Sequence, residues 1–186
     1  MITSQLPDTI KQHKESNPDH LRFGVALVST TRYNELANGL PSTDKTLAMV
    51  EPLLQARGHV LARREIVADD EAMIQAIVTA FTGAPGVDVL VTCGGTGISP
   101  RDVTIDAIAA MKPKMPKLLP GFGELFRALS FQDVGGAAML SRSEAFVIDQ
   151  KPVFCLPGSP KAVQLGLERL ILPEIAHLLA MLRKKE

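Results

Sequence analysis

A short apolar run that leads directly into a glycine-rich loop is the feature that most constrains how this chain can fold. The loop reads Cys93-Gly94-Gly95-Thr96-Gly97, and the run before it contains Val87, Val89, Leu90 and Val91. A continuous β-branched run bounded by glycines is typical of a strand buried on both faces, as in a parallel sheet covered by helices. Three glycines within four residues allow a sharp turn and expose backbone N–H groups to an anion. The segment therefore predicts a strand, a loop that could bind a phosphate group, and the start of a helix.

Polar side chains in and after this loop suit a phosphate and its metal. Thr96 offers a hydroxyl, Arg101 a cation and Asp102 a carboxylate within a few residues. The alternative is a tight strand-to-helix turn whose polar residues only cap the next helix, and the loop alone does not separate the two, because glycine-rich loops are common. Asp102 favours the first interpretation, since Val103-Thr104 is the more natural cap region and the carboxylate would then lean into the loop.

The first half of the chain alternates strands with helices. Strands are expected at Phe23–Val28 and Val60–Val67, and helices after Ser42-Thr43-Asp44 and after Asp69-Asp70-Glu71. The polar segment 29–34 is expected to belong to a loop. The order strand, helix, strand, helix, strand, helix predicts a parallel sheet with helices on both faces.

The second half is less regular. It is expected to add a short helix at 121–127, two neighbouring strands at 145–148 and 153–156, and a last helix that begins near Pro160 and restarts at Pro173. Residues 1–20 are polar and contain prolines, so they are expected to form a flexible arm. Residues 21–186 are then expected to form one domain.

The composition excludes several classes of function. The 186 residues include 20 Lys and Arg and 20 Asp and Glu, so the formal net charge is zero and neither a nucleic-acid nor an anionic-membrane surface is expected. No apolar stretch approaches the roughly 20 residues of a membrane helix, and a cytoplasmic protein is expected. Cys93 and Cys155 are too few for a disulfide framework and are expected to be buried free thiols, and the histidines lack zinc-site spacing.

In an open parallel sheet, ligands bind outside the carboxyl ends of the strands. Loops of this kind are expected after Val28, Val67, Thr92 and Leu156, where they could surround an anionic, nucleotide-like ligand. Close backbone approach would come from two glycines and hydrogen bonds from four hydroxyls: Gly95, Gly158, Ser29, Thr96, Ser141 and Ser159.

Several of these residues have a purely structural alternative. Ser159 precedes Pro160 and is a good helix N-cap, and Asp69 can cap a helix in the same way. Arg142 could pair with Glu144 or Glu124 on the surface, which would contribute little to stability.

Four motifs follow one another between residues 22 and 182. They are Gly94-Gly95-Thr96-Gly97 followed by Arg101-Asp102-Val103-Thr104, Pro120-Gly121-Phe122-Gly123-Glu124, Met139-Leu140-Ser141-Arg142, and Leu156-Pro157-Gly158-Ser159-Pro160. In this order they resemble the MogA/MoaB proteins of molybdenum-cofactor biosynthesis. The resemblance implies an α/β molybdopterin-binding-domain fold, with three α/β/α layers around a mainly parallel sheet, assembled as a homotrimer or homohexamer. It also implies molybdopterin adenylyltransferase activity, in which magnesium-ATP and molybdopterin give adenylylated molybdopterin and pyrophosphate.

The resemblance also assigns roles to residues. Asp69 and Asp102 match acids of the family and are expected to be catalytic or magnesium-positioning carboxylates, which suits a reaction that brings several negative charges together. The backbone cradle would be Gly94, Gly95, Thr96 and Gly97. Contributors to the pterin and nucleotide pocket would be Ser29, Glu124, Ser141, Arg142, Gly158 and Ser159. The resemblance also implies other enzymes of cofactor biosynthesis as partners.

The chain departs from the family pattern in its first loop. Family members commonly carry Ser-Asp-Thr or Ser-Asp-Arg after the first strand, whereas this sequence has Ser29-Thr30-Thr31, so one acid near the pocket is missing. The alternative function is a non-catalytic molybdopterin-binding or scaffold member of the same fold, against which the presence of Asp69 and Asp102 argues. Related domains of CinA-type and MoeA proteins normally belong to longer chains.

Overall fold

The computed structural model describes residues 20–112 and 116–184, which form one six-stranded sheet in the order β2-β1-β3-β6-β5-β4. The strands are β1 (Arg22–Val28), β2 (Val60–Val67), β3 (Val89–Cys93), β4 (Lys117–Leu118), β5 (Glu144–Ile148) and β6 (Lys151–Leu156). The first four in the pairing β2-β1-β3-β6 are parallel, while β5 runs antiparallel to β6 and β4 antiparallel to β5. The expected mainly parallel sheet is confirmed, and the expected N-terminal arm lies almost wholly outside the described residues.

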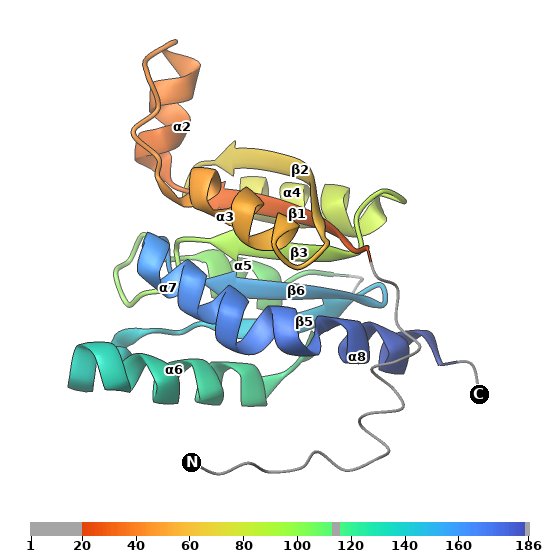
Figure 1. Ribbon diagram of the computed structural model, residues 1–186. Coiled ribbons are helices and arrows are strands. Elements are labelled where there is room, and N and C mark those ends of the chain that lie inside the picture. The colour runs from red at the N-terminus through yellow and green to blue at the C-terminus, as the bar shows by residue number, and fades with distance from the viewer. Residues whose placement is uncertain (1–19, 113–115, 185–186) are drawn as a thin grey trace.

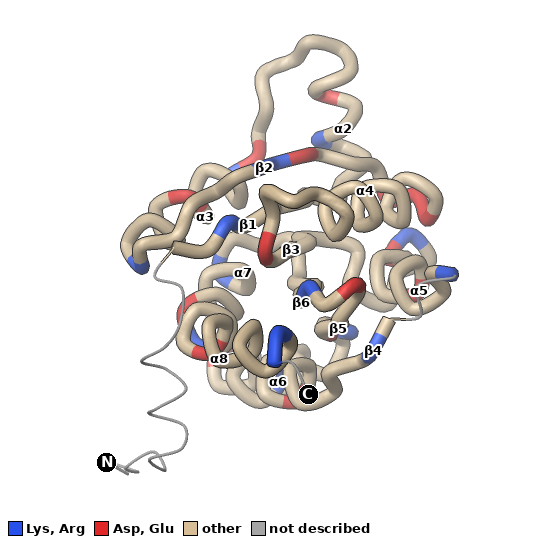
Figure 2. Tube along the Cα trace, turned by 90° about the vertical axis from the view of Figure 1, so that its right-hand side faces the viewer, with Lys and Arg blue, Asp and Glu red and all other residues tan. Residues whose placement is uncertain are grey.

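Helices cover both faces of the sheet, as Figures 1 and 2 show. One face packs against α3 (Thr46–Gln55), α6 (Pro120–Val134), α7 (Pro160–Gly166) and α8 (Leu172–Arg183), and the other against α4 (Glu71–Gly83) and α5 (Thr104–Ala109). Each face has its own apolar core, because successive strand residues point to opposite sides. The strand β3 is buried at every position, as its continuous apolar run predicted. The three-layer α/β/α architecture is thereby confirmed.

The segment after β1 differs from expectation. Where a polar loop was expected, Thr30–Ala37 forms helix α2, none of whose residues is buried and which projects beyond the edge strand β2 (Figure 1). Polar contacts replace an apolar face: the N–H of Arg32 donates to Ser29 Oγ, and Arg32 forms an ion pair with Glu35 at 2.8 Å. The N–H of Thr43 donates to the carboxylate of Glu35, and this bond fastens the following loop to the helix. The same bond lowers the pKa of Glu35. A helix held in this way leaves no 3.6-residue hydrophobic period in the sequence.

The second half follows the expected order with two differences in extent. Helix α6 runs over Pro120–Val134 and is about twice as long as the expected short helix, because its one proline and its two glycines are confined to its first turn, where proline is tolerated. The two-residue strand β4 was not expected. The restart near Pro173 is confirmed, since the π turn Leu167–Ile171 (η2) joins α7 to α8, and Pro173 lies in the first turn of α8.

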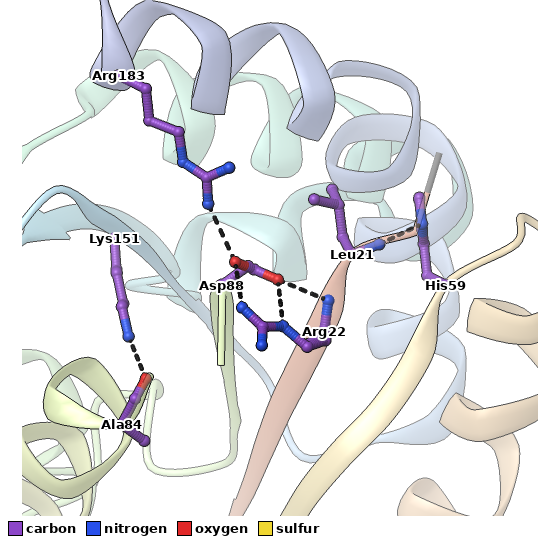
Figure 3. A network of polar contacts seen from close by, with 7 residues as sticks. All are labelled: Leu21, Arg22, His59, Ala84, Asp88, Lys151 and Arg183. Atoms are coloured by element: carbon purple, nitrogen blue, oxygen red, sulfur yellow. Dashed lines mark hydrogen bonds and ion pairs between the residues drawn. The ribbon is translucent and has the colours of Figure 1, made fainter. Parts of the chain in front are cut away.

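A charged network closes the amino ends of the strands, opposite the ends from which the predicted site loops leave. Asp88, which is 8% exposed, accepts hydrogen bonds from Arg22 at the start of β1 and from Arg183 of α8 (Figure 3). Burial by itself would raise the pKa of Asp88, but the hydrogen bonds and charge of Arg22, with Arg183, outweigh it and leave this pKa below its usual value. The network ties the first strand and the last helix to the core strand β3.

Across the described part of the chain, no helix is both long and apolar enough to cross a membrane. Cys93 and Cys155 are buried free thiols, as expected. Burial raises the pKa of both, to about 12 for Cys155, so neither thiol is reactive at neutral pH.

Candidate functional site

The carboxyl ends of the four parallel strands lie together along one edge of the sheet, at the left of Figure 1. Ser29 follows β1, Ala68 and Asp69 follow β2, Gly94 follows β3 and Pro157 follows β6. The chain passes from β1 to β2 on one side and then returns to β3 on the other, so the topology switches between β1 and β3. Open α/β sheets form their ligand crevices at such a switch point.

The glycine loop after β3 adopts a backbone that only glycine permits without strain. Gly94 and Gly95 have φ angles of 118° and 65°, in the region that L-residues rarely enter. A Cβ at Gly94 would lie 2.1 Å from the carbonyl oxygen of Val28, and one at Gly95 would lie 2.2 Å from Thr104 Oγ1. The sharp turn inferred from the glycines is therefore present, and it brings the backbone of the loop close to Val28 at the end of β1.

The loop is fixed at its base and leaves N–H groups unused. Thr104, which is buried, donates through its hydroxyl to the carbonyl of Gly94 and through its N–H to that of Gly95, at 2.9 and 3.0 Å. None of the N–H groups of Gly95, Thr96 and Gly97 donates a hydrogen bond to any described residue. Consecutive unsatisfied N–H groups in a turn are the physical basis of anion binding by such loops.

Asp102 leans back into the glycine loop, as the sequence predicted. Its Oδ2 accepts the N–H of Ser99 at 2.9 Å, while its own N–H donates to the carbonyl of Ser99 at 2.8 Å. A Cβ at Gly97 would lie 2.7 Å from Oδ2, so glycine is required there for the carboxylate to approach. Oδ1 accepts no hydrogen bond within the described residues, which leaves one oxygen for a ligand or cation.

The structural alternative for Asp69, that it only caps the helix that follows it, is wrong. Asp70 is the N-cap of α4, accepting the N–H of Met73 at 2.8 Å. Asp69 instead turns toward the start of α2, where its Oδ2 accepts from the N–H and the hydroxyl of Thr30 at 2.7 and 2.8 Å. Asp69 is therefore not needed as a helix cap, because its neighbour Asp70 supplies it.

Arg142 meets the glycine loop, but its guanidinium is occupied. Nε donates to the carbonyl of Gly97 at 2.8 Å, Nη2 to the carbonyl of Asp102, and Nη1 to Asp106 at 3.0 Å. Its N–H also donates to the carbonyl of Thr96 at 2.8 Å. The surface pairing with Glu144 or Glu124 that was considered is therefore wrong. Arg142 therefore holds the loop in place. The guanidinium of Arg101, in contrast, has no partner within the described residues and can reach a ligand.

A second arginine anchors the segment that carries Arg142. Arg127 of α6 donates through Nη1 to the carbonyls of Ser141 and Ser143, at 3.3 and 3.1 Å. It also lies 3.5 Å from Glu144, where burial raises the pKa of Glu144 and the charge of Arg127 opposes that rise. The sequence analysis did not select Arg127, since an arginine inside an amphipathic helix has no distinguishing local signal.

Two cavities lie on either side of the loop after β6. Ser141 and Ser159 line one of 680 Å³, together with Lys161 and the end of α6. Ser29 and Gly158 line the other, of 310 Å³. Ser159 is also the N-cap of α7, as expected, and accepts the N–H of Ala162 at 3.3 Å. Glu124 is exposed on α6 and lines neither cavity.

The smaller cavity contains charged residues that the sequence analysis did not assign to the site. Arg32, Asp44 and Lys45 line it, and Asp44 accepts the N–H groups of Thr46 and Leu47 at 3.0 and 2.9 Å. The side chain of Asp44 thus binds the first N–H groups of α3, although Lys45 occupies the N-cap position. The hydroxyl of Thr46 donates to the carbonyl of Gly158 at 3.0 Å and joins α3 to the loop after β6.

The donor set suits a magnesium ion that a nucleotide brings with it. The described residues contain no group of three or more His, Cys, Asp and Glu that could hold a metal by themselves. Asp69 and Asp102 nevertheless each keep one carboxylate oxygen without a hydrogen bond from a described residue. Mg²⁺ usually binds through one or two carboxylates, substrate phosphates and water rather than in an all-protein cage.

Comparisons with known proteins identify the family. The family described as "Probable molybdopterin binding domain" matches residues 25–177. The chain is 42% identical to molybdenum cofactor biosynthesis protein B of Bacillus subtilis over 177 residues, which cover 95% of this chain and 98% of that protein. It is also 42% identical to the protein of the same name from Bacillus anthracis, over 91% of this chain and 95% of that one.

Solved structures show the same fold. A crystal structure of molybdenum cofactor biosynthesis protein B superimposes with a TM-score of 0.80 at 42% identity, covering 90% of this chain and 99% of that one. The tungsten cofactor synthesizing protein MoaB from Pyrococcus furiosus gives a TM-score of 0.72 at 37% identity, with coverage of 90% and 99%.

Proposed function

Because this chain belongs to the MogA/MoaB family of molybdenum cofactor biosynthesis proteins, we propose that it is a molybdopterin adenylyltransferase. The observation that carries the proposal is the glycine loop, with its unused N–H groups and the carboxylate of Asp102 beside it, at the carboxyl ends of the strands, where Asp69 also keeps one oxygen without a hydrogen bond. A scaffold that only binds the pterin would need the loop but not the carboxylates.

In the proposed reaction, a phosphate oxygen of molybdopterin attacks the α-phosphorus of ATP. One P–O bond forms to the adenylyl group, the bond to the β-phosphate breaks, and pyrophosphate leaves. The N–H groups of Gly95, Thr96 and Gly97 would bind the phosphate oxygens, and Arg101 would add a positive charge. No covalent enzyme intermediate is required.

Asp69 and Asp102 would hold the magnesium ion of magnesium-ATP through their free oxygens. That ion, when bound, neutralises charge on the phosphates that must approach one another. Arg142 would keep the loop in its binding shape, because each of its three guanidinium nitrogens donates to the loop or to Asp106.

We expect the protein to form a homotrimer or homohexamer. Large apolar side chains are exposed along α6 and the 3-10 helix Gly135–Leu140 (η1): Leu125, Phe131, Val134, Met139 and Leu140. Exposed apolar side chains gathered on adjacent elements are typical of interfaces between protein chains, and a second copy of this chain is the expected partner.

The direct test of the reaction is to incubate the purified protein with molybdopterin, ATP and Mg²⁺ and to measure pyrophosphate and adenylylated pterin. Formation of both, in equal amounts, is expected. Tight pterin binding without either product would instead support the scaffold alternative.

A further inference from the structure

The contact between Thr30 and Asp69 is unusual in that it closes in both directions. Thr30 donates its N–H and its hydroxyl to the same oxygen of Asp69, Oδ2, at 2.7 and 2.8 Å, and the N–H of Asp69 donates back to Thr30 Oγ1 at 3.1 Å. A fourth bond nearby, from the N–H of Ser29 to the carbonyl of Val67 at 2.8 Å, also joins the two segments. The ends of β1 and β2 are thus linked by four hydrogen bonds at Asp69.

These bonds leave the two oxygens of Asp69 in different states. Oδ2 accepts two donors, one of them the first N–H of helix α2, whose positive end favours a negative charge. Oδ1 accepts no hydrogen bond from any described residue. Two donors on one oxygen fix the rotation of the carboxylate, so the free oxygen is presented in one direction.

The hydroxyl of Thr30 closes this pair in both directions, because its single oxygen donates and accepts at once. An ionised carboxylate at position 30 would accept but not donate, and its charge would face that of Asp69. Thr30 places no negative charge there and gives Asp69 a hydrogen-bonded partner.

We propose that Thr30 is a positioning residue that orients Asp69 toward the magnesium ion of the nucleotide. This inference rests on the proposed function, in which Asp69 binds that ion. Residues that hydrogen-bond a metal ligand typically change metal affinity 10- to 100-fold when removed. Since Thr30→Val keeps the backbone N–H bond and loses only the hydroxyl, an effect of about tenfold is expected.

The test measures binding rather than turnover. The probe is α,β-methylene-ATP, which cannot transfer its adenylyl group, and its affinity is measured by calorimetry with excess Mg²⁺ and again with EDTA. The ratio of the two affinities gives the contribution of the metal. In Thr30→Val this ratio is expected to fall about tenfold, whereas Thr30→Ser, which keeps the hydroxyl, should restore it.

Two further variants complete the design. Thr31→Val makes the same change at the next position of α2, where the exposed side chain has no hydrogen bond within the described residues, and should behave like the wild type. Asp69→Asn tests the proposed function itself and should abolish most of the metal contribution. A loss in Asp69→Asn with none in Thr30→Val would overturn the role of Thr30 alone. No loss in Asp69→Asn would overturn the metal role of Asp69 and with it the inference. Equal losses in Thr30→Val and Thr31→Val would show a general effect of α2 and also contradict it.

Discussion

Replacing Arg142 with alanine tests whether its contacts with the glycine loop stabilise the fold, and Arg101, which makes no such contacts, provides the comparison. The side chain of Arg142 donates to the carbonyls of Gly97 and Asp102 and pairs with Asp106 at 2.9 Å. Each hydrogen bond from its charged donors contributes about 1 kcal/mol, because the side chain is about one-third exposed. The exposed ion pair adds about 0.5 kcal/mol. Arg142→Ala should therefore lower the free energy of unfolding by about 2 to 3 kcal/mol.

Urea unfolding followed by circular dichroism measures that loss, and Arg101→Ala is the matched control. The Arg101 side chain has no partner within the described residues, so its removal should change the unfolding free energy by less than about 0.5 kcal/mol. Under the proposed function, Arg101→Ala should instead raise the KM for ATP. The reasoning is refuted if Arg142→Ala is as stable as Arg101→Ala, because the bonds to the loop would then contribute nothing.

Four more predictions follow from the same contacts. Asp102→Asn should keep pterin binding, measured by fluorescence, but reduce pyrophosphate release by orders of magnitude, and turnover at the wild-type rate would remove Asp102 from the mechanism. Gly94→Ala should lower the free energy of unfolding, measured in urea, by more than about 3 kcal/mol, because its Cβ would clash with the carbonyl of Val28. Gly83→Ala, at the end of α4 where a Cβ would meet no atom, should be neutral or stabilising, and equal effects of the two changes would contradict this reasoning. The lowered pKa of Asp88 should stabilise the protein above about pH 4 and lose that contribution as the pH falls through the folded pKa, so Asp88→Asn should flatten the acid limb of the stability profile. Light scattering at micromolar concentration should give a mass three or six times that of the chain, and a monomer would exclude the proposed assembly.

Much of the fold could be read from local patterns. The apolar run before Gly94 predicted β3 because a strand buried on both faces needs apolar residues at every position, and its burial is complete. The capping role of Ser159 and the tight turn at the glycines were also predictable, because both depend on residues that are near in sequence. Helix α2 was not, since it is held by polar contacts that create no hydrophobic period.

The sequence by itself determined the alternation of strands and helices, the glycine turn and the set of polar residues at the strand ends. Only the tertiary structure decided what those residues contact. Asp69 and Asp70 are interchangeable as helix caps in the sequence, and Thr30, 39 positions away, separates their roles. The sequence shows Arg142 only as a positive charge, whereas in the structure its guanidinium holds the glycine loop by donating to backbone carbonyls as many as 45 positions away. Backbone carbonyls are the same in every residue type, so no sequence pattern marks them as partners, and only the pairing of distant strands brings them within hydrogen-bond reach.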